Sequence, residues 1–412
     1  MSDATATDPI ASPEPRREVK PQQATSVYFA PGAAVAAATA AAQHGPPHVE
    51  QPVNYDAILL SGFGGPEGQE DVMPFLRNVT AGRGIPDERL EEVAHHYRAF
   101  GGVSPINEQN RALQRALSSA LSAAGIALPV YWGNRNWAPY LDDVLTQAAA
   151  DGIRKLLAVP TSAYSSYSSC RQYREDWADA LEASGLQETV QIDKVRQYFS
   201  HPGFVAPFTE GLQEAIAEAE CAGHDRAAIE VLFTTHSIPT ADAELSGAGL
   251  FAGVEGGGYA AQHLAVAHQI IADSAPEVAW QLVYQSRSGS PATPWLEPDI
   301  NDAITQLSAR TAVIIVPIGF LSDHLEVLWD LDREARETAE ESGLWVHRVA
   351  TPGTHPLFVE GLVDLIRERV VGRPVGRRTN VTSIGPWFDV CRPGCCAKGN
   401  AAPRPAIAGL PE

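Results

Sequence analysis

The stretch Val231-Leu232-Phe233-Thr234-Thr235-His236-Ser237-Ile238-Pro239 is an apolar strand that runs directly into a polar turn. A second stretch has the same design and reads Gly319-Phe320-Leu321-Ser322-Asp323-His324-Leu325-Glu326-Val327-Leu328-Trp329-Asp330. In open α/β sheets, ligands bind at the edge where the parallel strands end. We therefore expect a histidine from the first stretch and a carboxylate from the second to converge on one cleft. Such a pair can hold a divalent metal, move protons, or do both.

Apolar segments of the same kind recur from Tyr55 onwards. The predicted strands are Ala57–Leu60, Val130–Trp132, Leu156–Val159, Val231–Phe233, Trp280–Tyr284, Ala312–Ile318 and Trp345–Val349. Segments with helical periodicity lie between most of them, among them Asn107–Ala124, Tyr173–Ala183 and Ala206–Cys221. This alternation predicts an α/β fold in which helices cover both faces of parallel sheets.

The length of 412 residues suits two domains with tails. We expect a disordered N-terminal extension over residues 1–50, because it is rich in Ala, Pro, Thr and Gln and has no sustained period. An N-terminal α/β domain should follow over residues 51–205 and a C-terminal α/β domain over residues 206–371. Residues 372–412 lose the pattern and form a cysteine-bearing tail.

The formal net charge of −20 argues against nucleic acid, whose phosphates require Lys and Arg. No apolar run reaches the roughly 18 residues that a membrane helix needs. The Ala-rich run from Ala33 to Ala42 is too short to span a bilayer, and it does not follow the basic start of a signal peptide. We expect a cytoplasmic protein without stable membrane insertion, and a monomer.

The first strand leads into Ser61-Gly62-Phe63-Gly64-Gly65-Pro66. Three glycines allow the backbone to approach a ligand closely. Pro66 breaks the G-x-G-x-x-G spacing of a dinucleotide site. A tight turn with no ligand explains this motif equally well.

Glu326, Asp330 and Glu334 are spaced by four residues on a helix that we expect to begin at Ser322. At this spacing they form one stripe about 12 Å long. Like charges four residues apart repel by a few tenths of a kcal/mol. The stripe is either a solvated acidic face or a line of carboxylates that passes a cation toward the cleft. His236 has a similar alternative, as an ordinary polar residue at a turn.

Three of the five cysteines, Cys391, Cys395 and Cys396, are crowded into the tail. In a reducing compartment such a cluster favours a metal or iron–sulfur site over disulfides. The spacing is unusual for zinc, and adjacent cysteines suit a cluster with two irons better. The fourth ligand must then be Cys170 or Cys221.

Four motifs together resemble the ferrochelatases, which insert ferrous iron into a porphyrin. These are the opening strand with Phe63-Gly64-Gly65-Pro66, then Gly101-Gly102-Val103-Ser104-Pro105-Ile106-Asn107, Thr235-His236-Ser237-Ile238-Pro239 and Ser322-Asp323-His324-Leu325-Glu326-Val327-Leu328. The resemblance covers roughly Tyr55 to Arg369, and the tail is similar to that of soluble bacterial members that act on coproporphyrin III and carry a [2Fe–2S] cluster. It implies two similar doubly wound domains with the porphyrin in the cleft between them.

The resemblance also implies roles for individual residues. His236 and Glu326 match the iron-binding and catalytic pair, and Asp330 and Glu334 match an outer acidic line. Ser104 and Tyr173 match porphyrin-contacting positions, and we expect Phe63 and Arg83 to bind the substrate as well. The cluster ligands are matched by Cys170, Cys391, Cys395 and Cys396. Some relatives have an iron-ligating tyrosine where this chain has Phe63, and an arginine where it has Thr80, for which Arg83 is the nearest replacement.

The implied chemistry needs a base near the ring centre, because two pyrrole N–H protons must leave before the metal enters. Histidine suits this, with an ordinary pKa near neutrality. Imidazole with carboxylate also holds iron(II) without trapping it, as a ring of thiolates would. Three alternatives remain: protoporphyrin IX as the substrate, a haem- or metal-binding carrier without turnover, and an iron–sulfur electron-transfer protein.

Overall fold

The computed structural model describes residues 48–82, 84–251, 253–288, 292–399 and 404–410. Most of the predicted extension over residues 1–50 lies outside these ranges, as does Arg83, the predicted substrate-binding arginine.

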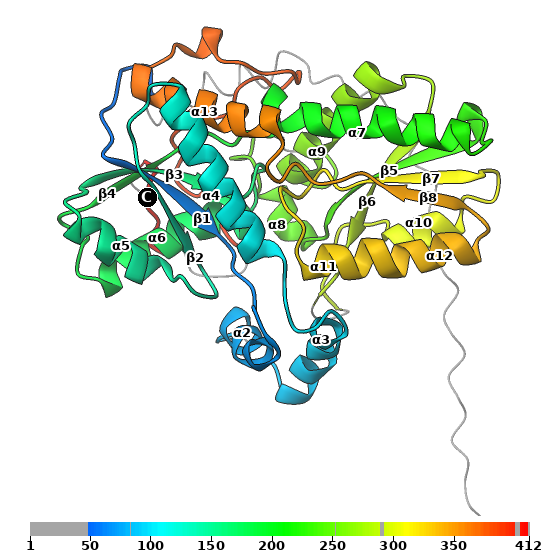
Figure 1. Cartoon of the computed structure of the whole chain (residues 1–412), viewed down its shortest axis with the longest axis horizontal. Helices are drawn as coiled ribbons and strands as arrows, with labels where there is room; N and C mark the ends of the chain where they lie inside the picture. Colours follow the sequence, from blue (N-terminus) through cyan, green and yellow to red (C-terminus); the bar gives the residue numbers. More distant parts are fainter. Residues whose placement is uncertain (1–47, 83, 252, 289–291, 400–403, 411–412) are drawn as a thin grey trace, which may run out of the picture.

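Two four-stranded parallel sheets form the frame of the molecule (Figure 1). The first has the order β2-β1-β3-β4, with β1 (Ala57–Gly62), β2 (Val130–Asn134), β3 (Lys155–Pro160) and β4 (Gln191–Lys194). The second has the order β6-β5-β7-β8, with β5 (Ile229–His236), β6 (Ala279–Gln285), β7 (Ala312–Val316) and β8 (Trp345–Arg348). In each sheet, the strand that comes second in the chain lies at the edge, next to the strand that comes first. The prediction of two similar parallel α/β units is confirmed.

Alternate residues of each strand pack against different layers of helices. In β1, Ile58 and Leu60 join the large central core, whereas Ala57 and Leu59 join a separate cluster on the other face. In β5, Val231 faces the central core and Leu232 the opposite cluster. Because both faces are buried, the strands read as continuous apolar runs, as expected for parallel sheets.

The helices lie on both sides of the sheets and in a small lobe. Their bounds are α2 (Val72–Val79), α3 (Asp87–Ala99), α4 (Ile106–Ala123), α5 (Leu141–Ala150), α6 (Gln172–Ala183), α7 (Pro202–Cys221), α8 (Thr240–Glu244), α9 (Gly257–Ser274), α10 (Ile300–Thr305), α11 (Leu325–Val327), α12 (Ala335–Glu341) and α13 (Pro356–Val371). Short π-helical segments span Tyr167–Arg171 and Leu328–Glu334. Figure 1 shows α2 and α3 projecting from the body of the molecule, with α3 next to α11.

Two sequence expectations need correction. Strand β4 was not predicted, because Gln191-Ile192-Asp193-Lys194 carries one apolar residue among polar ones. The helix expected from Ser322 begins only at Leu325, where the His324 side chain accepts a hydrogen bond from the Val327 N–H at 3.4 Å, and it continues as a π-helix rather than a regular α-helix.

The division into domains stays a prediction. Its boundary at residues 205/206 falls inside α7, which begins at Pro202. Helix α13 also packs against both α4 and α7. Among the described helices, none is both long enough and apolar enough to cross a membrane.

Candidate functional site

His236 is the last residue of β5 and pairs in register with Gln285, the last residue of β6. Gly319 follows β7 and lies so close to this strand end that a Cβ on it would be 2.1 Å from Thr235 Oγ1. Only glycine permits this approach, which directs the following loop toward His236. The loop then leads into α11, which carries Glu326.

The imidazole of His236 and the carboxylate of Glu326 face each other at the carboxyl edge of the second sheet. His236 Nε2 lies 3.3 Å from Glu326 Oε1, and the side chains are 35% and 41% exposed. The sequence prediction that these two residues come together is confirmed as geometry. Their exposure leaves both groups accessible to a ligand.

The orientation of the His236 ring is fixed by its other nitrogen. His236 Nδ1 lies 2.5 Å from the carbonyl oxygen of Ser237, which can only accept a hydrogen bond. Nδ1 therefore carries a proton, and Nε2 presents either its lone pair or a second proton to Glu326. The Tyr259 hydroxyl donates to the His236 carbonyl oxygen at 3.0 Å, which anchors the end of β5 to α9.

The acidic line continues from Glu326 through the π-helical segment. Burial, reinforced by the charges of Glu326 and Glu334, raises the pKa of Asp330 to about 8. Glu326 and Glu334 therefore both lie within electrostatic reach of Asp330. Glu334, at the outer end, is exposed and accepts a hydrogen bond from Trp329 Nε1 at 2.7 Å. π-Helical turns are often found at functional sites, where they redirect side chains.

Two residues that the sequence did not indicate hold Asp330 in place. Gln285 Nε2 lies 3.4 Å from Asp330 Oδ2, and the Ser286 hydroxyl donates to the same oxygen. Ser286 has a φ of 61°, a left-handed conformation that is uncommon outside glycine. The only sequence signal for this pair is its position at the end of β6, at the same edge as His236.

The first half of the chain contributes an aromatic wall. Phe63 lies edge-on to Phe75 at 6.3 Å between ring centroids, and Phe75 contacts Tyr97 and Trp137. Burial, reinforced by the charge of Glu326, raises the pKa of Tyr97, so this hydroxyl lies within electrostatic reach of Glu326. Tyr97 was not singled out in the sequence, since a tyrosine on an amphipathic helix is ordinarily a packing residue.

The other predicted substrate-binding residues lie deeper in the first half. Ser104 is buried, and a Cβ on Gly65 would be 2.8 Å from its Cβ. Tyr173 is also buried, and its hydroxyl oxygen lies 3.2 Å from Thr161 Oγ1. Arg135 lies over the Tyr173 ring at 4.5 Å and over Phe63 at 5.8 Å.

Four of the five cysteines gather at a second location. The cluster consists of Cys170, Cys391, Cys395 and Cys396, all buried, whereas Cys221 is exposed. Cys396 Sγ lies 3.7 Å from both Cys170 Sγ and Cys395 Sγ, far longer than a disulfide bond. The structure thus places Cys170, and not Cys221, beside the three tail cysteines.

The surroundings of this thiol cluster are cationic. Hydrogen bonds from Cys170 and Cys395 hold the pKa of Cys391 well below its usual range, and the charges of Lys194 and Arg174 act in the same direction. Arg174 is buried, and its Nη1 and Nη2 atoms have no hydrogen-bond partner among the described residues. An anionic group at the thiols would suit these donors.

Within the described ranges, no three His, Cys, Asp or Glu side chains are arranged to hold one metal ion. A [2Fe–2S] centre shares four thiolates between two irons, so it does not need three protein donors around one ion. The four buried thiols and their cationic surroundings therefore fit such a centre.

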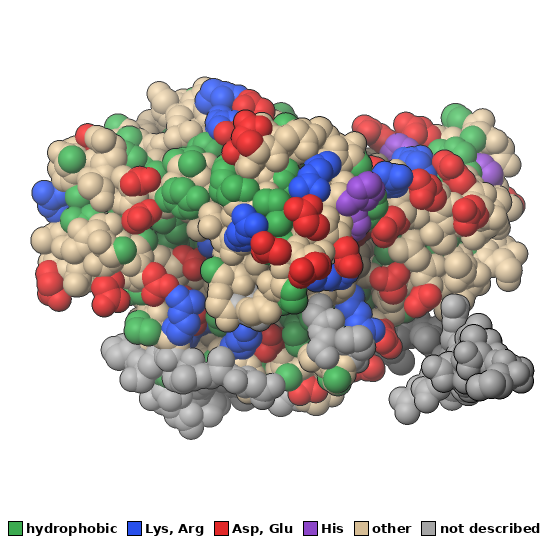
Figure 2. Space-filling model, turned by 90° about the horizontal axis from the view of Figure 1, so that it is seen from below, with side chains coloured by type: hydrophobic (Ala, Val, Ile, Leu, Met, Phe, Trp, Pro, Cys, Tyr) green, Lys and Arg blue, Asp and Glu red, His purple; other side chains and the backbone are tan. Residues whose placement is uncertain are grey.

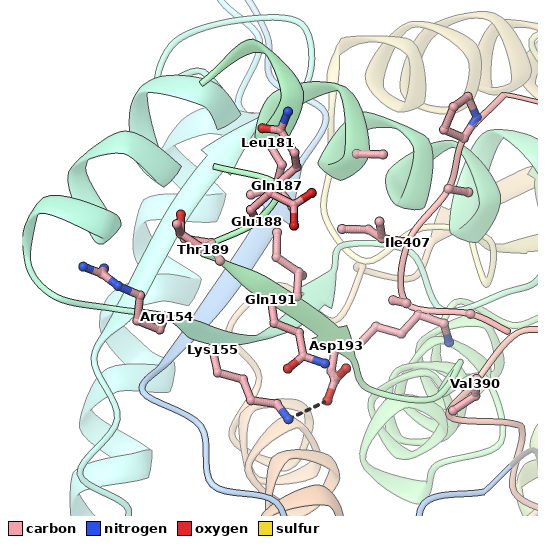
Figure 3. A pocket seen from close by; sticks show the side chains of 18 of the residues that line it. Arg154, Lys155, Leu181, Gln187, Glu188, Thr189, Gln191, Asp193, Val390 and Ile407 are labelled. Atoms are coloured by element: carbon pink, nitrogen blue, oxygen red, sulfur yellow. Dashed lines mark ion pairs between the residues drawn. The ribbon is translucent and has the colours of Figure 1, made fainter. Parts of the chain in front are cut away.

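A cavity of about 920 Å³ opens between β4 and the tail (Figure 3). Neither His236 nor Glu326 is among the residues that line it. Lys155, Asp193, Val390 and Ile407 are among the residues that line it. On the face seen in Figure 2, acidic and basic side chains are interspersed and no broad basic patch appears.

The ferrochelatase family model matches residues 55–370, which include every strand of both sheets. The chain belongs to the ferrochelatase family. It is 61% identical over 386 residues to the coproporphyrin III ferrochelatase of Leifsonia xyli, an alignment that covers 90% of this chain and 99% of that relative. It is 54% identical over 360 residues to the coproporphyrin III ferrochelatase of Tropheryma whipplei, covering 86% of this chain and 92% of that one.

Among solved structures, SirB from Bacillus subtilis with Fe3+ aligns with a TM-score of 0.45 and 12% identity, over 79% of this chain and all of that one. The range matched by the ferrochelatase family model includes His236, Glu326, Asp330 and Glu334. The tail cysteines lie beyond the matched range.

Proposed function

We propose that this chain inserts ferrous iron into free-base coproporphyrin III in haem biosynthesis. The observation that carries this proposal is the 3.3 Å approach of His236 Nε2 to Glu326 Oε1 at the carboxyl edge of the second sheet. The names of the relatives that match over most of the chain support coproporphyrin as the substrate.

His236 and Glu326 act together in this proposal. With Nδ1 committed to the Ser237 carbonyl, Nε2 is the nitrogen that accepts a pyrrole proton. Glu326 then stabilises the imidazolium that forms, and the same two groups can hand over the metal. The incoming iron and the leaving protons thus use one pair of side chains.

Glu334, Asp330 and Glu326 supply the path for iron. Carboxylates bind hard and borderline cations, and the series runs from an exposed residue to the pair at the cleft. Gln285 and Ser286 keep the middle carboxylate in position.

Phe63, Tyr173 and Ser104 contribute to the porphyrin site. The half-buried Phe63, which packs edge-on against the buried Phe75, offers an apolar surface to the macrocycle. Phe63 has no ligand atom, so it contributes contact and not iron ligation. Arg83 remains a proposed partner of a propionate and lies outside the described residues.

Cys170, Cys391, Cys395 and Cys396 would hold a [2Fe–2S] cluster, which supplies one-electron redox chemistry or a structural link when bound. These residues join the tail to the segment that precedes α6. We place the protein in the cytoplasm as a monomer.

The test is anaerobic incubation of the purified protein with iron(II) and coproporphyrin III or protoporphyrin IX, followed by absorption spectra. The proposal predicts catalytic loss of the free-base coproporphyrin spectrum with two protons released per turnover. A higher kcat/KM with protoporphyrin IX would show that protoporphyrin IX is the preferred substrate. Binding without turnover would indicate a carrier.

A further inference from the structure

Two buried cations stand next to the thiol cluster. Arg174 and Lys194 are each 1% exposed. A Cβ on Gly409 would lie 2.1 Å from Arg174 Nη2 and 3.1 Å from the Cys391 carbonyl oxygen, which places the guanidinium against the cysteine-bearing tail. Lys194 ends β4 and lines the same cavity as Val390, which precedes Cys391, and Gly409, which pairs with Cys391 in a β-bridge. Its positive charge acts to lower the pKa of both Cys170 and Cys391.

Within the described part of the chain, neither cation has the counter-ion that burial normally requires. Arg174 bonds through Nε to the Ile407 carbonyl oxygen at 2.7 Å, and its two other nitrogens have no hydrogen-bond partner among the described residues. Lys194 Nζ reaches only the Val195 carbonyl oxygen, at 3.3 Å, within that part of the chain. A buried charge without a counter-ion strongly destabilises the folded state.

The carboxylates nearby are already paired with other cations. Asp193 binds Arg369, with 3.2 Å between the nearest atoms. Two further pairs are Asp389 with Arg378 at 2.6 Å and Glu175 with Arg171 at 2.7 Å. Among the described residues named here, the groups left to balance Arg174 and Lys194 are the four cysteines of the thiol cluster.

We propose that Arg174 and Lys194 are the counter-charges of the anionic centre held by the four cysteines, and that they set its reduction potential. Four thiolates and two sulfides outweigh the charge of two ferric ions, so a [2Fe–2S] centre is an anion. One electron from an external one-electron donor adds a further negative charge, which nearby cations stabilise. This inference rests on the proposed cluster and assigns two residues to it.

The test is the midpoint potential of the full-length protein, measured by following the visible spectrum during stepwise dithionite reduction. Lys194→Met and Arg174→Met should each shift the reduction equilibrium about tenfold toward the oxidised form, a fall of about 59 mV for a one-electron couple. Lys194→Arg and Arg174→Lys keep the charge and should stay near the wild-type potential. Lys155→Met is the matched control, since Lys155 is 30% exposed and pairs with Asp193.

Iron and sulfide content separates the remaining outcomes. Loss of the centre in both Met variants, with retention in both charge-preserving variants, also supports the proposal. If the Met variants hold the centre and their potentials are unchanged, the proposed role of the two cations is wrong, although the cluster itself stands. Loss of the centre in the charge-preserving variants would also contradict that role. Wild-type protein without iron and sulfide overturns both this inference and the proposed cluster.

Discussion

Trp329 of the π-helical segment stacks on His96 of α3, with ring centroids 3.9 Å apart and planes inclined by 5°. Phe100 meets the same indole edge-on at 6.2 Å. Because α3 belongs to the projecting lobe and Trp329 lies next to Asp330 and donates a hydrogen bond to Glu334, this contact links the lobe to the candidate iron path.

His96→Ala should loosen that link. Loss of the stacked ring removes the principal contact that His96 makes with Trp329, so α3 should open more often. We expect hydrogen exchange of the α3 amides to rise several-fold, with global stability changed by less than about 1 kcal/mol. His95→Ala is the control, because His95 is exposed. Equal exchange in the two variants would show that the stack does not restrain the lobe.

Asp330→Asn and Glu334→Gln should raise the KM for iron about three- to tenfold each and change the KM for porphyrin little. Each substitution removes one carboxylate from the proposed path and leaves the His236–Glu326 pair intact. Glu337→Gln serves as the control, since Glu337 pairs with Arg333 outside the line. Steady-state kinetics with iron varied checks this, and an unchanged iron dependence in the double variant would contradict the path.

Cys170→Ser should abolish the visible absorption of the proposed cluster and lower the melting temperature by at least a few degrees, because the tail loses its attachment. Cys221→Ser should do neither, since Cys221 is exposed and outside the cluster. Spectra, iron and sulfide analysis and thermal melts decide this. A colourless wild-type protein that contains one zinc ion per chain would contradict the proposed [2Fe–2S] cluster.

His263 predicts a pH dependence of stability. Burial lowers its pKa to about 3, against an ordinary value of 6.5. Between these values the unfolded chain binds a proton that the folded chain does not, so stability is complete above pH 6.5 and is lost as pH falls. Relative to His263→Phe, the wild type should lose about 1.6 kcal/mol between pH 6.5 and pH 5. Parallel denaturant titrations of both proteins would show no pH-dependent difference if this histidine were protonated in the fold.

Most of the frame was predictable from the sequence, because fully buried strands such as β5 and β7 are continuous apolar runs. Strand β4 was missed, since an edge strand such as Gln191–Lys194 needs little apolar character. The meeting of His236 and Glu326 followed from their positions after parallel strands. The roles of Gln285, Ser286 and Tyr97 did not, because they depend on contacts between segments far apart in the chain.

The most direct test of the central claim is the turnover number for iron insertion into coproporphyrin III by the wild type and by His236→Ala. His224→Ala is the control, since His224 bonds to Thr311 Oγ1 outside the site. If His236 is the base, His236→Ala should lose at least about a hundredfold in kcat with an unchanged circular dichroism spectrum, and Glu326→Gln should also lose most activity. Near-normal turnover in a folded His236→Ala protein would contradict the account.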